Sequence, residues 1–208
     1  MIIVQDFIPA GRGNRPGRLN PMKFITIHNT GNTNAGANAK SHAAYLKSDA
    51  AAKAPTSWHY TVDEHGAYQH LPDNEDAYHA GDGSGNGNRE SIAIEICMNS
   101  DGNQVKATDN AATLAANLCK QYSIPIANVV QHNRWSGKHC PQMLREGRPY
   151  SWETFLGIVA GRAAQHWAKP SLEYLRGIGL TINEERYGDP VTRGELFALL
   201  ERYDRLKK

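Results

Sequence analysis

Two segments far apart in the chain carry residue types that together can bind a transition metal. Residues 24–30 read FITIHNT and contribute His28, whereas residues 131–141 read QHNRWSGKHCP and contribute His132 and Cys140. Two imidazoles and one thiolate fill three corners of a Zn²⁺ tetrahedron and leave the fourth open for water, as in catalytic rather than structural zinc sites. This residue set therefore predicts a hydrolytic metal centre.

Each of these residues has a more ordinary interpretation when taken alone. A single histidine on a strand, such as His28, is more often structural than a ligand, and the pairing of His132 with Cys140 is a weak motif by itself. Cys140, however, stands in a polar stretch just before a proline, which suits a thiolate better than an inert core cysteine. The other histidines considered are expected at the surface: His42, His65, His70 and His166.

A carboxylate interrupts the most regular strand pattern of the chain, SIAIEIC at residues 91–97. Ile92, Ile94 and Ile96 form one apolar face, and Glu95 points to the other. A carboxylate in an apolar strand costs free energy unless it is paired or functional. Beside a metal, desolvation would raise its pKa and suit it to general acid and base catalysis. The alternative is that Glu95 lies on the solvated face of an edge strand.

The elements that must position these residues indicate an α/β fold. Residues 1–23, rich in Gly, Arg, Asn and Pro, are expected to form a loop-like arm, and the Gly-rich run 81–88 a flexible loop at the rim of the site. Alternating strands and helices predict a mixed central β-sheet flanked by helices over residues 1–164. Strands are expected at 24–28, 58–62, 91–97 and 128–131, and helices at 37–54, 108–122 and 152–161.

Composition and charge are those of an ordinary globular chain. Its 208 residues are 40% hydrophobic and 21% charged, and a net charge of +2 is too small to indicate a nucleic-acid partner. Three unclustered cysteines indicate reduced thiols, with Cys97 and Cys119 expected in the core. We find neither a signal peptide nor an apolar run long enough for membrane insertion, and therefore expect synthesis in the cytoplasm.

Five stretches, taken in order, resemble the zinc-dependent N-acetylmuramoyl-L-alanine amidases of the type 2 amidase superfamily, which includes many phage endolysins. They are ITIHNT at 25–30, WHYTVD at 58–63, AYHAG at 77–81, SIAIEIC at 91–97, and residues 132–141. The resemblance covers about residues 22–145 and is specific only when the stretches are combined. It implies the amidase fold and zinc-activated hydrolysis of the bond between N-acetylmuramic acid and L-alanine in bacterial peptidoglycan.

The resemblance also implies roles for residues of this chain. One Zn²⁺ per chain would be bound by His28, His132 and Cys140. Glu95 would be the acid and base, and Lys138 would stabilise the oxyanion.

Two further residues, Trp58 and His79, would line the substrate cleft. Some relatives carry a tyrosine where this chain has Trp58, which leaves more of the proton transfer to Glu95.

The C-terminal segment, residues 165–208, resembles a single S-layer-homology-type repeat, which anchors proteins to secondary cell-wall polymers. Thr192 and Glu195 match a capping box. An apolar helical stripe follows at Leu196, Leu199, Leu200 and Tyr203. A unit of about 40 residues has a marginal core. It would therefore pack on the amidase domain or pair with a second copy in a homodimer, and the alternative is a helical hairpin that only caps the catalytic domain.

The function expected from these features is that of a phage endolysin, released to the cell wall through a holin-type membrane lesion. A bacterial autolysin is the nearest alternative. A non-catalytic peptidoglycan-binding protein needs neither Glu95 nor Cys140. An enzyme with Cys140 as nucleophile would differ in its response to chelators.

Overall fold

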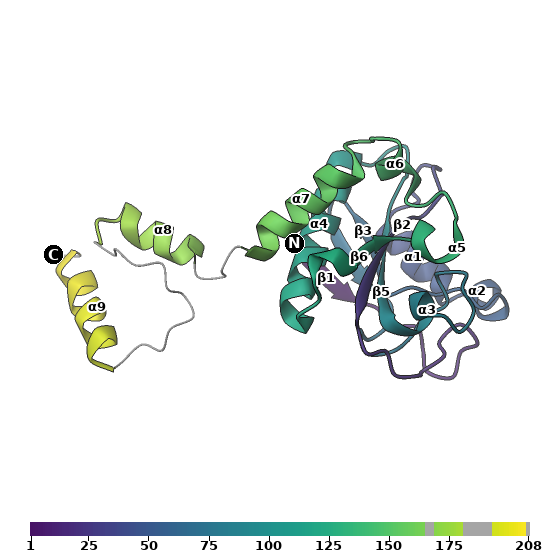
Figure 1. Cartoon of the computed structure of the whole chain (residues 1–208), viewed down its shortest axis with the longest axis horizontal. Helices are drawn as coiled ribbons and strands as arrows, with labels where there is room; N and C mark the ends of the chain where they lie inside the picture. Colours follow the sequence, from purple (N-terminus) through teal and green to yellow (C-terminus); the bar gives the residue numbers. More distant parts are fainter. Residues whose placement is uncertain (165–168, 181–192, 207–208) are drawn as a thin grey trace. The chain divides into compact units, whose positions relative to one another are not determined.

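The computed structural model describes residues 1–164, 169–180 and 193–206. By contacts the chain divides into two compact units, Met1–Ala163 and Ala164–Lys208. The second unit contains α8 (Lys169–Gly177) and α9 (Arg193–Leu206), and we describe each unit by itself (Figure 1). None of the described helices combines the length and apolar character needed to cross a membrane.

A mixed sheet forms the centre of the first unit, as predicted. Its neighbouring strands are parallel except for the antiparallel pair β3–β4. The carboxyl ends of β5, β2 and β6 therefore meet at one edge of the sheet, which is where open α/β sheets bind their ligands. Across the described sheet the order is β1 (Ile2–Gln5), β4 (Gly66–Gln69), β3 (Tyr60–Asp63), β5 (Ser91–Ile96), β2 (Phe24–Asn29) and β6 (Val129–Gln131).

Helices cover the two faces of this sheet with cores of different size. The larger core joins the isoleucines of β2 and β5 to α4 (Gln104–Tyr122) and α7 (Trp152–Ala164). The smaller core lies on the opposite face and joins Ala93 of β5 to α1 (Ala39–Leu46) through Leu46. Short elements complete the unit: α2 (Asp49–Lys53), α3 (Asn86–Glu90), η1 (Ile126–Asn128), α5 (Asn133–Ser136) and α6 (Gln142–Arg145).

Two local predictions were wrong. The arm at residues 1–23 is not only a loop, because it contains β1, which pairs in parallel with β4 at the sheet edge. All four residues of β1 are exposed, so no alternation of buried and exposed positions marked it as a strand. The expected helix at 37–54 is two helices, and the Ser48 hydroxyl between them accepts the Ala51 N–H as the cap of α2.

Candidate active site

Three predicted ligands converge at the carboxyl edge of the sheet. His28 lies near the end of β2, and His132 follows β6 directly. Cys140 follows α5 and is held close to His132, because its carbonyl accepts the Asn133 N–H. All three side chains are buried, and their ligand atoms lie within 4.8 Å of one another.

In both histidines Nδ1 is the ring nitrogen left available to a metal. His132 Nε2 lies 2.9 Å from the Ala80 carbonyl oxygen, which can only accept, so Nε2 carries the proton. His132 Nδ1 is then a buried lone pair, without a hydrogen-bond partner among the described residues. His28 Nδ1 lies 4.0 Å from Cys140 Sγ. In a tetrahedral zinc site the nitrogen and sulfur ligands are about 3.6 Å apart, so this donor set fits zinc after a small contraction.

Burial sets the protonation of the three ligand residues. It lowers the pKa of His28 well below its usual value and lowers that of His132, so both imidazoles are neutral, as metal ligands must be. Burial raises the pKa of the Cys140 thiol to about 12, with a smaller contribution from the Glu95 carboxylate. A coordinated cation reverses such a shift, because it stabilises the thiolate directly.

Glu95 lies beside the three ligands. It pairs in register with His28 across β5 and β2, so both side chains leave the sheet on the same face. Its Oε1 lies 3.7 Å from His28 Nδ1, and its Oε2 is buried with no hydrogen-bond partner in the described part of the chain. Burial raises the pKa of Glu95 to about 8, and the nearby Lys138 charge opposes the shift. Glu95 is therefore not the solvated carboxylate of an edge strand.

A cleft of about 950 Å³ opens over these residues. Lys138 is exposed and lies on its wall, as do Trp58 and His79. Trp58 is largely buried, and its indole N–H donates to the Thr61 hydroxyl at 2.7 Å. The structure thus brings all seven predicted site residues to one cleft. Other lining residues include Arg18, His42, Tyr45 and Tyr78.

Several polar residues near the site were misjudged or missed from the sequence. His42 and His70, expected at the surface, are buried, whereas His65 is exposed and His166 lies outside the described residues. The Gly-rich run was expected to be a flexible rim loop, but it contains Asn88, whose Oδ1 accepts the N–H groups of His79 and Ala80, both at 2.8 Å. An Asn within a glycine run indicates a turn in general. The sequence does not show which backbone N–H groups its side chain accepts.

Two imidazoles and a carboxylate at the ends of parallel strands, with a buried thiol beside them, have the arrangement of a zinc hydrolase. The family model Amidase_2, described as N-acetylmuramoyl-L-alanine amidase, matches residues 18–143. The chain belongs to this family, which confirms the predicted family and fold.

Individual relatives show the same likeness. The chain is 47% identical to N-acetylmuramoyl-L-alanine amidase XlyA of Bacillus subtilis (strain 168), over 86% of this chain and 60% of XlyA. It is 46% identical to the amidase CwlH of the same organism, over 85% of this chain and 68% of CwlH. The chain thus spans about 60% of the length of XlyA.

Solved structures agree with this fold. The catalytic domain of XlyA matches with a TM-score of 0.72 at 50% identity, covering 76% of this chain and 99% of that domain. PlyL matches with a TM-score of 0.68 at 37% identity, covering 76% of this chain and 97% of PlyL.

Proposed function

We propose that this chain hydrolyses the amide bond between N-acetylmuramic acid and L-alanine in peptidoglycan, and that it acts as an endolysin. The observation that carries the proposal is the buried group of His28, His132 and Cys140 beside Glu95, within the segment that matches the amidase family. The relatives XlyA and CwlH, which carry the amidase name, share nearly half of their aligned residues with this chain.

His28 Nδ1, His132 Nδ1 and Cys140 Sγ would hold one Zn²⁺. When bound there, zinc supplies a Lewis acid that activates water and polarises the amide carbonyl.

Two further side chains have roles of their own. The Glu95 carboxylate takes a proton from the attacking water and delivers it to the departing L-alanine nitrogen, and burial raises its pKa to about 8, which favours holding that proton between the two steps. The Lys138 ammonium, exposed on the cleft wall, offsets the negative charge that develops on the carbonyl oxygen. Trp58 and His79, both on the cleft wall, would line the bound substrate.

The test is to measure zinc content and wall-lysing activity of the purified chain before and after chelation. We expect one zinc per chain, with activity that is lost on chelation, is restored by Zn²⁺ and releases N-terminal L-alanine. Activity that survives complete removal of zinc would instead favour Cys140 as a nucleophile. Bound zinc with no release of L-alanine would favour a non-catalytic binding protein.

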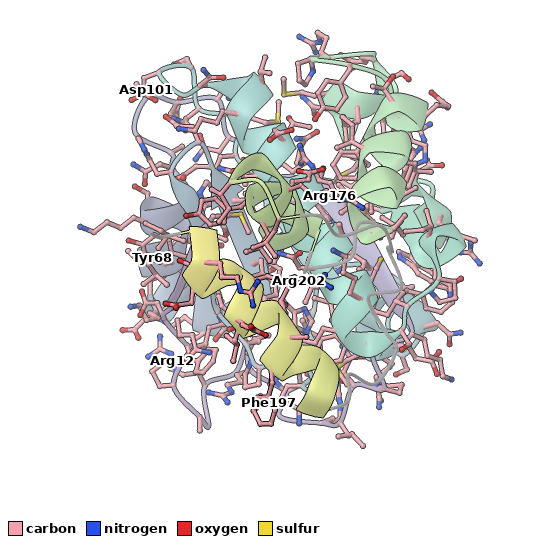
Figure 2. All side chains as sticks on the ribbon, turned by 90° about the vertical axis from the view of Figure 1, so that its left-hand side faces the viewer. Arg12, Tyr68, Asp101, Arg176, Phe197 and Arg202 are labelled. Carbon is pink, nitrogen blue, oxygen red and sulfur yellow. The ribbon has the colours of Figure 1, made fainter. Side chains whose placement is uncertain are left out.

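We propose further that residues 1–164 form the catalytic domain and residues 165–208 bind a secondary cell-wall polymer. The alignment with XlyA is longer than residues 1–164, so it includes part of the C-terminal unit. Leu196, Phe197 and Leu200 of α9 are exposed, and Figure 2 shows Phe197 and Arg202 projecting from this helix. Exposed apolar patches often mark interaction sites. Thr192 of the expected capping box lies outside the described residues.

Deleting residues 165–208 tests this assignment. We expect the shortened chain to keep amidase activity on soluble wall fragments and to lose retention on intact walls. Unchanged retention would contradict the binding role, and a change from dimer to monomer on deletion would favour pairing between two copies. Since the substrate lies outside the membrane, an endolysin also needs a partner that opens the membrane, such as a holin.

A further inference from the structure

The His79 imidazole stands directly behind the candidate ligand His28. His79 Nδ1 lies 3.0 Å from His28 Nε2, the nitrogen that faces away from Cys140. The other ring nitrogen, His79 Nε2, lies 3.3 Å from the Ser91 hydroxyl. His79 therefore bridges His28 to a set of buried hydrogen bonds on the far side from the metal position.

The direction of those hydrogen bonds is determined at both ends. At one end, the Trp135 indole N–H, which can only donate, bonds the Thr26 hydroxyl at 2.9 Å, and Thr26 donates in turn to Ser91 at 2.8 Å. At the other end, the Ser91 hydroxyl donates to the Gly87 carbonyl at 2.6 Å. The single proton of Ser91 is thus already used.

This leaves one assignment for the two imidazoles. Since Ser91 has no second proton, His79 Nε2 must donate to Ser91, and His79 Nδ1 is a lone pair. That lone pair can only accept from His28 Nε2–H. The His28 proton is then on Nε2, and its Nδ1 lone pair faces Cys140 and Glu95.

We infer that His79 is a positioning residue, which holds His28 in the tautomer and orientation that present Nδ1 to the metal. The inference rests on the zinc site proposed above and adds a role for His79 to its place on the cleft wall. Residues that orient metal-bound histidines in this way typically change metal affinity about 10- to 100-fold when they are removed.

The backbone of His79 is held as firmly as its side chain. Asn88 Oδ1 accepts the N–H groups of both His79 and Ala80. The Ala80 carbonyl accepts from His132 Nε2, so the same dipeptide orients the second imidazole. Asn88 is itself fixed, because its backbone N–H donates to Asp82 Oδ1 at 3.2 Å and its side-chain amide donates to the Gly83 carbonyl at 3.0 Å.

The experiment compares variants of the full chain by zinc affinity, measured in competition with a chromogenic chelator. His79→Leu should weaken zinc binding about 10- to 100-fold. His79→Asn places an acceptor oxygen near the Nδ1 position and should restore most of the affinity. His59→Leu is the control, because it removes a buried imidazole whose nitrogens bond the Ala93 N–H and the Glu75 carbonyl rather than a candidate ligand. It should lower stability and leave zinc affinity unchanged.

A second measurement reads the tautomer directly and needs no variant. Long-range ¹H–¹⁵N correlation spectra of the metal-free chain should show His28 and His79 both protonated at Nε2. A proton on His28 Nδ1, or His79→Leu protein with the parent's zinc affinity, would overturn the inference. A parent chain that binds no zinc would overturn the metal site itself, and the inference with it.

Discussion

His28 and Glu95 are direct partners across the parallel strands β2 and β5, with Nδ1 and Oε1 3.7 Å apart. Because partners in register leave a sheet on the same face, a candidate metal ligand and a candidate proton carrier share one side of two adjacent strands. The isoleucines that alternate with them pack into the larger core on the opposite side. His28 and Glu95 are thus carried by the sheet itself, which favours accurate positioning.

The first prediction separates proton transfer from metal binding. Glu95→Gln keeps the size and buried position of the side chain but cannot exchange a proton. We expect wall-lysing turnover to fall about 10²- to 10⁴-fold, the range of general acid and base catalysis. Zinc content should stay at one per chain. Turnover within a few-fold of the parent would contradict the role of Glu95.

The second prediction concerns zinc as a stabilising ligand. An ion that binds only the folded chain stabilises it by about 2.7 kcal/mol at a free concentration 100 times its Kd. Zn²⁺ should therefore raise the Tm of the parent chain, and Cys140→Ala should abolish that rise. Cys119→Ala is the control, because Cys119 is buried in α4 within the larger core, and it should lower the Tm while keeping the response to zinc.

The third prediction is a pH dependence of stability that comes from His70. Burial lowers the pKa of His70 to about 3, and in the unfolded chain it is near 6.5. Between these values the unfolded chain binds more protons, so the stabilising contribution is complete above pH 6.5 and is lost as the pH falls toward 3. From pH 7 to pH 5 the loss amounts to about 2 kcal/mol.

Denaturant titrations at several pH values measure this effect. His70→Gln can keep the hydrogen bond to the Thr61 hydroxyl and should flatten the decline between pH 7 and pH 5. His42 and His59, whose pKa values are also lowered by burial, would still contribute a slope. His65→Gln changes an exposed imidazole and should leave the decline as in the parent. Equal slopes for His70→Gln and the parent would rule out His70 as the source.

The fourth prediction compares two phenylalanines in different settings. Phe155 of α7 is fully buried in the larger core, and Phe155→Ala should cost about 3–5 kcal/mol of unfolding free energy. Phe197 of α9 is 64% exposed, so Phe197→Ala should change stability by less than about 0.5 kcal/mol. Retention on intact walls should nevertheless fall in Phe197→Ala if α9 contacts a wall polymer. A large loss of stability in Phe197→Ala would show that this side chain is packed.

Some histidines show why sequence reasoning failed around a site it had identified. His59 and His70 are buried without being candidate ligands, and their rings bond the Glu75 carbonyl and the Thr61 hydroxyl. His42, also buried, bonds the Asn38 carbonyl one helical turn earlier. Burial of a polar ring depends on whether a partner from a distant segment meets it. His59, for example, bonds the Glu75 carbonyl and the Ala93 N–H from two other segments. Local spacing carries no record of such partners.

The residue types were enough to identify the candidate donor set, two imidazoles and one thiol, and the carboxylate in an apolar strand, and their pattern was enough to predict the α/β architecture. Strand periodicity also placed His28 and Glu95 opposite the isoleucines.

Which nitrogen of each histidine is left available to a metal follows from the folded structure and not from the residue pattern. That choice depends on hydrogen bonds that the two rings donate to the Ala80 carbonyl and to His79 Nδ1, in a turn closed by Asn88. A tautomer is selected by the donors and acceptors that surround a ring in space, and these come from parts of the chain that folding alone brings together.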